Sequence, residues 1–190
     1  MIPLINRLSF LKYLLLFGLS FNHRPLGAQP DQVLALMNEA RTDPQGFLTH
    51  RLLPFVKEKR LEDNRYAQSL IEELKSAKKI NPLNSSPVLE KLARAHAQDM
   101  GSHGKVGHSS SNGMSFENRV RKKIKTGMIA ENCDYGNSEP LDIVMSLLID
   151  DGITSLGHRK NILHPDLKSV GIAIEEHKTY GMNCVMDFSG

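Results

Sequence analysis

Two segments near the C-terminal end of the chain read Val170-Gly171-Ile172-Ala173-Ile174 and Asn183-Cys184-Val185-Met186-Asp187-Phe188. In both segments the character of the side chains alternates from one residue to the next, which is typical of strands that bury one face. Lys178-Thr179-Tyr180-Gly181 lies between them and can form a hairpin turn. Residues 129–135 also have the length of a strand. We therefore expect a sheet that is built mostly from the end of the chain.

Helical patterns fill the earlier part of the chain. Asp31, Asp43 and Ser138 stand where N-terminal caps are expected, and Ser86-Pro87 starts a long helix. His96 lies on the apolar face of that helix, so we expect a core histidine bonded to the backbone. The expected helices cover residues 31–41, 44–55, 62–77, 88–100, 115–124 and 141–149, with a short helical turn at 156–163. Helices first and strands mostly last favour an α+β layered fold over a Rossmann alternation.

The first residues have the layout of a secretory signal peptide. Arg7 and Lys12 lie near the apolar run 14–19, and the small residues of 26–28 offer a cleavage point before Gln29. The run is shorter than the roughly 20 apolar residues of a spanning helix, so no stable membrane span is expected. A retained interfacial anchor is the alternative. We expect residues 1–28 to be removed and the protein to be secreted or periplasmic.

The charge of the chain does not indicate a nucleic-acid partner. The sequence has 24 Lys and Arg against 21 Asp and Glu, a net charge of +3. Arg7, Lys12 and Arg24 belong to the expected leader, so the mature chain is near neutral. The basic cluster that remains is Arg121-Lys122-Lys123 with Lys125. We interpret it as a solvated helix face, with contact to headgroups or polyanions as the minor alternative.

The second half of the chain carries a scattered set of polar residues. They are Gly107-His108-Ser109, Ala130-Glu131-Asn132, Asp150-Asp151-Gly152 and Gly157-His158-Arg159-Lys160-Asn161-Ile162-Leu163. Two neutral imidazoles with nearby carboxylates suit a divalent metal ion, with zinc first on ligand type. The spacing is non-local, so it cannot show by itself that these residues converge.

In their order these motifs resemble the CAP superfamily of cysteine-rich secretory proteins, antigen-five allergens and plant pathogenesis-related proteins. The bacterial type of this family is the most similar. The resemblance covers roughly Val33 to Phe188. It implies a three-layer α-β-α sandwich with a mostly antiparallel central sheet. It also implies a single CAP/SCP domain over 29–190, with N-terminal helices in 29–80 and the motifs in 81–190.

The resemblance assigns cavity positions residue by residue. The first His of the family pattern matches His108, the Glu of its Glu-Asn pair matches Glu131, and its final Gly-His matches Gly157-His158. Asp150 stands where the animal proteins have Glu, and Leu147 replaces their Trp, so the membership of Asp150 stays open. The two imidazoles of the pattern are the expected metal ligands. The residues expected to support the site are Asn132, Arg159 and Asn161.

Cys133 and Cys184 are the cysteines of this sequence. An even number in an exported protein suggests a disulfide. The bond would close a loop of about 50 residues and contribute roughly 4 kcal/mol in the chain-entropy model. It is geometrically easy if the two strands are neighbours in one sheet. We expect the disulfide, and two buried free thiols are the alternative.

Three functions remain open from the sequence. The first is a secreted binding or interaction module, whose His/acid cavity holds a divalent metal, a lipid, another small molecule or a protein partner. The second is a metal-dependent hydrolase, a peptidase above all, with Glu131 as general base. The third is a structural surface protein with a non-catalytic polar network. The sequence has no His-Glu-x-x-His, Gly-x-Ser-x-Gly or Cys-x-x-Cys motif, so we place a monomeric, non-enzymatic binding module first.

Overall fold

The computed structural model of the protein describes residues 29–125 and 127–190, so the leader expected at 1–28 lies outside the described residues. The elements are α1 (Gln29–Thr42), α2 (Pro44–Phe47), the π-helical turn η2 (Leu48–Leu52), α3 (Leu53–Lys59), α4 (Arg65–Ser76), β1 (Asn84–Ser85), α5 (Pro87–His103), α6 (Phe116–Arg121), β2 (Ile129–Tyr135), α7 (Pro140–Ile149), α8 (Gly157–Ile162), β3 (Ser169–His177) and β4 (Gly181–Ser189). None of the helices in this part of the chain is long and apolar enough to cross a bilayer.

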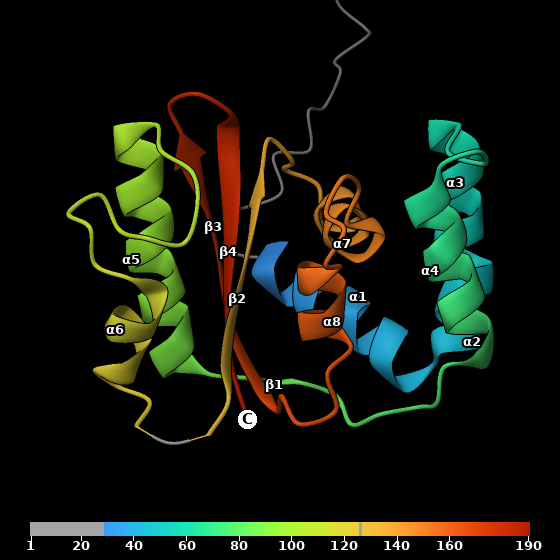
Figure 1. Cartoon of the computed structure of the whole chain (residues 1–190), viewed down its shortest axis with the longest axis horizontal. Helices are drawn as coiled ribbons and strands as arrows, with labels where there is room; N and C mark the ends of the chain where they lie inside the picture. Colours follow the sequence, from blue (N-terminus) through green and yellow to red (C-terminus); the bar gives the residue numbers. More distant parts are fainter. Residues whose placement is uncertain (1–28, 126) are drawn as a thin grey trace, which may run out of the picture.

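The strands of the described residues form one mixed sheet in the order β1-β3-β4-β2. The short strand β1 pairs in parallel with β3, whereas the pairs β3–β4 and β4–β2 are antiparallel. Figure 1 shows α5 and α6 on one face of the sheet and α1, α7 and α8 on the other, with α3 and α4 beyond that second layer. The expected α+β sandwich with a mostly antiparallel sheet is confirmed.

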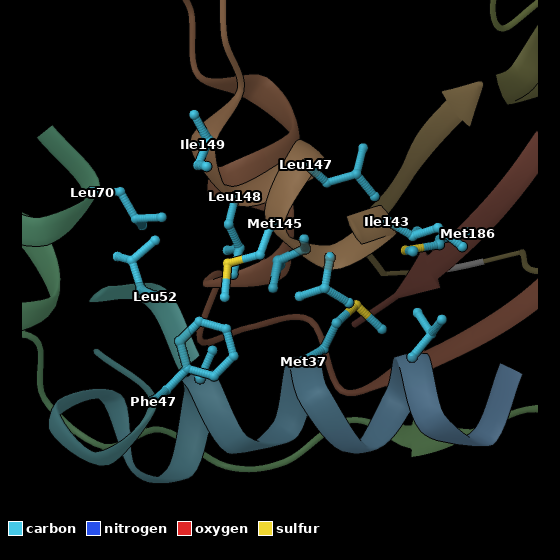
Figure 2. Packing of buried hydrophobic residues seen from close by; sticks show 14 of the residues in the cluster. Met37, Phe47, Leu52, Leu70, Ile143, Met145, Leu147, Leu148, Ile149 and Met186 are labelled. Carbon is cyan, nitrogen blue, oxygen red and sulfur yellow. The ribbon is translucent and has the colours of Figure 1, made fainter. Parts of the chain in front are cut away.

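The main hydrophobic core lies between the sheet and the helices α1 and α7. Figure 2 shows Met37 of α1 and Phe47 of α2 facing the α7 side chains, which include Met145 and Leu148. All residues of α7 from 143 to 149 except Ser146 are buried. A helix that is apolar on nearly all sides must be enclosed, and α7 is therefore the central helix of this layer.

The helix α5 lies unusually close to the sheet. The side chains between them are short and belong to Ala93, Ala97, Cys133, Ala173 and Val185. A Cβ added at Gly171 of β3 would lie 1.9 Å from the backbone nitrogen of Glu90 in α5. Glycine is thus required where the two backbones meet. This close approach brings polar side chains of α5 directly against the strands.

A buried arginine ties α1 to the chain that follows α8. Arg41 is 1% exposed. Its guanidinium donates to the carbonyl oxygens of Asn81 at 2.9 Å, Ile162 at 2.6 Å, and His164 and Leu167 at 3.0 Å. Hydrogen bonds from a charged donor are stronger than neutral ones. They hold the end of α8 in place against the first helix.

Several helix starts differ from the sequence prediction. Asp43 makes no side-chain cap bond to α2, and the cap position of α7 is Glu139 rather than Ser138, again without a cap bond. Both helices have Pro in the first turn, where its fixed backbone angle favours a helix start without a cap. Asp31 lies inside the first turn of α1 rather than before it. Asn64 caps α4 and accepts two backbone N–H groups.

The expected disulfide between Cys133 and Cys184 is wrong, because both residues are buried free thiols. Their strands are neighbours, but the partner of Cys133 across the β2–β4 ladder is Val185. Consecutive side chains of a strand point to opposite faces. Cys133 therefore packs under α5, whereas Cys184 belongs to the core beneath α1 and α7. The sheet itself separates the two sulfur atoms.

Candidate functional site

The turn between α7 and α8 holds the first of two His–carboxylate pairs. Asp150 ends α7 in a left-handed conformation, with φ at 58°, and is 2% exposed. Its Oδ2 accepts the backbone N–H groups of His158 and Arg159 at 3.0 and 3.4 Å. Its Oδ1 lies 2.7 Å from Nδ1 of His158. Asp150 therefore accepts the free backbone N–H groups at the start of α8 and also fixes the orientation of the His158 ring.

Arg159 holds α8 against α7 and α4. It is 1% exposed and donates to the carbonyl oxygens of Leu148 and Ile149 at 2.7 and 3.1 Å. It also reaches the carbonyl oxygen of Tyr66 at 2.9 Å and the carboxylate of Glu73 at 3.1 Å. A buried charge is tolerated only when it is paired and hydrogen-bonded in this way. The α7–α8 turn is therefore positioned from two neighbouring helices.

Two asparagines tie β2 to α8. Asn132 is fully buried, and its Nδ2 donates to the carbonyl oxygen of His158 at 3.0 Å. Asn161 donates to Oδ1 of Asn132 at 2.8 Å and to the carbonyl oxygen of Glu131 at 3.4 Å. These bonds join motifs that are far apart in the sequence.

A cavity of about 540 Å³ opens beside β2, α7 and the α7–α8 turn. Its wall includes Asp150 and His158, and the His158 side chain is 24% exposed. The other acidic lining residues are Asp134, Asp142 and Asp151. The apolar ones include Phe55, Leu61, Leu147, Ile149 and Ile153. The cavity thus has an apolar part and an acidic part.

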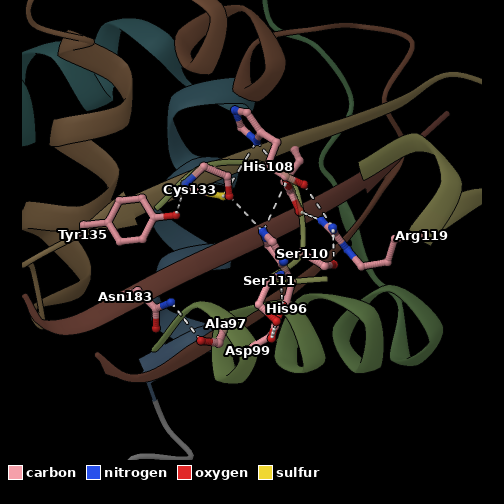
Figure 3. Close-up of polar contacts among 12 residues, drawn as sticks. His96, Ala97, Asp99, His108, Ser110, Ser111, Arg119, Cys133, Tyr135 and Asn183 are labelled. Carbon is pink, nitrogen blue, oxygen red and sulfur yellow. Dashed lines mark hydrogen bonds and ion pairs between the residues drawn. The ribbon is translucent and has the colours of Figure 1, made fainter. Parts of the chain in front are cut away.

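The second His–carboxylate pair lies on the face of β2 that is turned toward α5. Glu131 is buried, and its Oε1 accepts from Nδ1 of His108 at 2.9 Å. Its Oε2 accepts from the guanidinium of Arg119, which also donates to the carbonyl oxygen of His108 at 3.1 Å. Figure 3 shows the side chains of His108 and Arg119 in this cluster of polar contacts. Arg119 was not singled out from the sequence.

These contacts set the charge of the pair. Burial alone would raise the pKa of Glu131, but the hydrogen bond from His108 and the charge of Arg119 outweigh burial and hold that pKa below its usual value. The hydrogen bond to Glu131 raises the pKa of His108. Both oxygens of Glu131 are engaged, and one of them faces a permanent cation. Glu131 is therefore poorly suited to act as a general base.

Asp187 lies beside Glu131 and was also missed by the sequence analysis. The two residues are paired across β2 and β4, and Asp187 is fully buried. Within the described residues, neither Asp187 oxygen has a hydrogen-bond donor. Burial and the negative charge of Glu131 raise the pKa of Asp187 to about 9. Asp187 therefore keeps a proton at neutral pH, which it can donate to Glu131.

His96 and Cys133 complete this face of β2. His96 is 1% exposed, and its Nε2 donates to the carbonyl oxygen of Gly107 at 2.9 Å, as expected of a core histidine. The same nitrogen lies 4.0 Å from Oε1 of Glu131, which was not expected. The Sγ atom of Cys133 lies 3.9 Å from Nδ1 of His108. Burial raises the pKa of the Cys133 thiol well above its usual value, so this thiol is not a ready nucleophile.

The expected site residues thus come together as two pairs, His108 with Glu131 and Asp150 with His158. Each imidazole offers its other ring nitrogen, as in metal-binding histidines that a carboxylate orients. Both oxygens of Asp150 are already engaged by His158 and the α8 backbone. A zinc ion held by His108 and His158 would therefore need ligands other than Asp150, because zinc takes three or four protein ligands. That two-histidine zinc site stays a prediction.

Comparison with known proteins relates the chain to one family. The model of a family described as the cysteine-rich secretory protein family (CAP) matches residues 34–188. The uncharacterized protein YkwD of Bacillus subtilis strain 168 is 32% identical over 98 residues, which are 51% of this chain and 36% of that protein. The aligned part is thus little more than a third of the relative's length.

Two solved structures are also similar. An outer surface protein from Borrelia burgdorferi superposes with a TM-score of 0.49 and 19% identity, over 65% of this chain and 87% of that one. An extracellular protein containing a SCP domain, from Bacillus anthracis strain Ames, superposes with a TM-score of 0.49 and 18% identity, over 65% of this chain and 38% of that one.

Replacing Asp187 with Asn is expected to stabilise the protein at neutral pH by up to roughly 4 kcal/mol, because each pH unit above the unfolded pKa costs the native carboxyl about 1.4 kcal/mol. Because the folded pKa of about 9 lies above the unfolded value, the folded state keeps a proton that the unfolded state has released between about pH 4 and pH 9. Stability of the native chain therefore falls as pH rises. The amide of the variant needs no proton. The difference in free energy of unfolding between the variant and the native protein, measured by urea unfolding, should therefore widen as pH rises.

The exposed residue Asp63 provides the control, because Asp63→Asn leaves the buried cluster unchanged. Its free energy of unfolding should follow that of the native protein at every pH. If the difference in free energy of unfolding between Asp187→Asn and the native protein stays constant, or narrows, between about pH 5 and pH 8.5, Asp187 is ionised in the folded state.

Proposed function

Because this chain belongs to the cysteine-rich secretory protein family, we propose that it is a secreted binding module that holds a small ligand in the cavity beside β2. The observation that carries the proposal is the Asp150–His158 pair in the cavity wall. The volume of the cavity, about 540 Å³, lies within the usual range of small-molecule sites. The pair is held rigidly by the α8 backbone, so the site is formed before a ligand enters.

The wall chemistry favours a ligand with a cationic or hydrogen-bond-donating head on an apolar body. Lys59 pairs with Asp142 at 3.0 Å, and Asp151 accepts only a neutral amide from Asn64 at 3.0 Å. Asp134 accepts from the amide of Asn137 at 3.0 Å. The acids of the wall thus outnumber its cations. An alkyl carboxylate would meet like charge here, whereas an ammonium group would find counter-charges.

Burial makes Asp134 the best counter-ion for such a head. It is 4% exposed, and burial raises its pKa. A buried carboxylate gains most from a cation, because burial in a low-dielectric wall disfavours its charged form. The neighbouring apolar side chains of Phe55, Leu61 and Ile153 can cover the body of the ligand.

The same geometry argues for binding over hydrolysis. A general base must reach the reacting water, but Glu131 does not line this cavity among the described residues, and Arg119 occupies one of its oxygens. Asp150 uses both oxygens to hold His158 and α8. Neither carboxylate of the expected set is therefore free for catalysis.

Secretion is part of the proposal. The leader pattern of residues 1–28, with its basic start, short apolar run and small residues before Gln29, supports it. The family description names secretory proteins, which agrees with that pattern.

Short alkylamines are expected to bind the protein at least about tenfold more tightly than alkylcarboxylates of equal chain length, a difference of about 1.4 kcal/mol. Calorimetry or NMR titration measures both series. Asp134→Asn should remove most of the preference, because the amide has the shape of the carboxylate without its charge. His158→Gln should weaken binding of the amines.

The control variant is Asp166→Asn, an exposed acid that does not line the cavity. It should bind the amines like the native protein. Tighter binding of the carboxylates would contradict the proposed ligand class. Amine binding that survives both cavity variants unchanged would place the ligand elsewhere.

When the full chain is expressed in a bacterial cell, the exported protein is expected to begin at Gln29. Mass spectrometry of protein recovered outside the cytoplasm gives its N-terminus. A chain that starts at Gln29 behind a new Met should stay in the cytoplasm. Full-length protein that remains inside the cell would contradict secretion.

A further inference from the structure

Three potential metal-donor atoms gather on the face of β2 that is turned toward α5, and a fourth, on His108, lies beside two of them. Nδ1 of His108 lies 2.9 Å from Oε1 of Glu131 and 3.9 Å from Sγ of Cys133. Nε2 of His96 lies 4.0 Å from the same Oε1. Ligand atoms of His96, Glu131 and Cys133 all lie within 4.8 Å of one another. Tetrahedral zinc, with bonds of 2.0–2.3 Å, needs donor separations of roughly 3.3–3.8 Å. The ring of His108 must therefore move away from Oε1 of Glu131 and toward His96, because His108 lies outside that group of three.

Three separate elements supply these donors. Glu131 and Cys133 are two residues apart on β2 and therefore share one face. His96 comes from α5, which the glycine contact at Gly171 holds close to the sheet. His108 lies in the loop after α5, and its side chain is 53% exposed. Figure 3 shows His96, His108 and Cys133 in one cluster, and the exposed side chain of His108 marks the side from which an ion would enter.

Unsatisfied buried groups next to this point are a second observation. Among the described residues, both oxygens of Asp187 and Nδ1 of His96 are buried without a hydrogen-bond partner. Asp187 is fully buried and stands opposite Glu131 in the β2–β4 ladder. Buried polar atoms are rarely left unpaired, and each such case calls for a physical explanation such as a bound water or ion. A cation beside Glu131 would give Asp187 a counter-charge when its carboxyl ionises.

The formal charges also balance around a divalent ion. Arg119 and a divalent cation together bring three positive charges. Glu131, an ionised Asp187 and a Cys133 thiolate bring three negative charges. Arg119 engages only Oε2 of Glu131, so Oε1 remains on the side of the two imidazoles. When the ion binds, the Cys133 thiol and the Asp187 carboxyl release their protons to water, and the thiolate becomes the ligand.

We propose that this face of β2 is a tetrahedral site for a zinc-type transition-metal ion, with His96, His108, Glu131 and Cys133 as ligands. Two imidazoles, one thiolate and one carboxylate select zinc or cobalt over magnesium and calcium, which prefer oxygen ligands. Asp187 and Arg119 lie behind the ligands and orient Glu131. The site differs from a zinc held by His108 and His158, because it uses Cys133 and His96 and does not need His158. Cys133 also lines the cavity of the proposed function, whereas His96, His108 and Glu131 are not among the described residues of its wall.

Binding requires two local rearrangements, and the first breaks the hydrogen bond between Nδ1 of His108 and Oε1 of Glu131. In the second, Nε2 of His96, which donates to the carbonyl oxygen of Gly107 at 2.9 Å, loses its proton to Nδ1 by a change of tautomer and turns its lone pair to the ion. Gly107 lies in the same loop as His108 and has φ at 106°. The backbone N–H of Gly107 also donates to the hydroxyl of Tyr135 at 2.9 Å, which anchors the loop while the carbonyl contact is released. Each rearrangement replaces one hydrogen bond with a metal–nitrogen bond.

Cobalt(II) titration of the reduced, metal-free protein tests the site, because a thiolate ligand gives cobalt an intense near-ultraviolet band and a tetrahedral site gives strong visible bands. The native protein is expected to bind one cobalt ion with both signals. Cys133→Ser should remove the thiolate band. His96→Gln should weaken cobalt binding at least about tenfold while circular dichroism shows the native fold.

Matched controls are Cys184→Ser, a buried thiol on the other face of the sheet, and His164→Gln, outside the cluster. Both should keep the two signals. The proposal is overturned if the folded native protein binds no cobalt, if the thiolate band survives Cys133→Ser, or if binding depends on His158 but not on His96. Alkylamine binding by His96→Gln reports on the cavity independently, because His96 is not among the described residues that line it, so the two proposals can fail separately.

Discussion

The register in which β2 pairs with β4 is the constraint on which both polar sites depend. It sets Glu131 opposite Asp187 and, two residues on, places Cys133 on the same face beneath α5. Asn132 and Asp134 lie on the opposite face and turn toward α8 and the cavity. Because side chains alternate along a strand, a slip by one residue would exchange the two sets. Carboxylates and amides would then be buried without their partners on both faces.

The two His–carboxylate pairs use similar chemistry in different surroundings. Asp150 presents His158 to a cavity that a ligand can enter. Arg119 instead forms an ion pair with Glu131, whose side chain is 1% exposed and therefore shielded from solvent. Buried ion networks of this kind contribute little net stability compared with apolar packing of the same volume. The stability of the fold therefore does not explain the cluster beneath α5, and the proposed metal site gives another reason for it.

Most helices and the three longer strands could be predicted from the sequence because their signals are local, whereas the two-residue strand β1 was not predicted. The strand expected at 129–135 is β2 with the same bounds, Ile129–Tyr135. The site depends on non-local contacts, so Arg119 and Asp187 could not be distinguished from other residues of a basic helix and an alternating strand. Which face each cysteine occupies depends on register, and the disulfide prediction failed for that reason. Neighbouring strands alone do not bring Cys133 and Cys184 together.

The register can be measured directly by cross-linking. Directly opposed residues of antiparallel strands have Cα atoms about 4.5–5.5 Å apart, within the range that a disulfide spans. Val185→Cys is introduced in a Cys184→Ala background, and the oxidised protein is digested without reduction and analysed by mass spectrometry. We expect the introduced thiol to form a disulfide with Cys133, while the native chain forms none between Cys133 and Cys184. The opposite pattern would contradict the register and, with it, the placement of both sites.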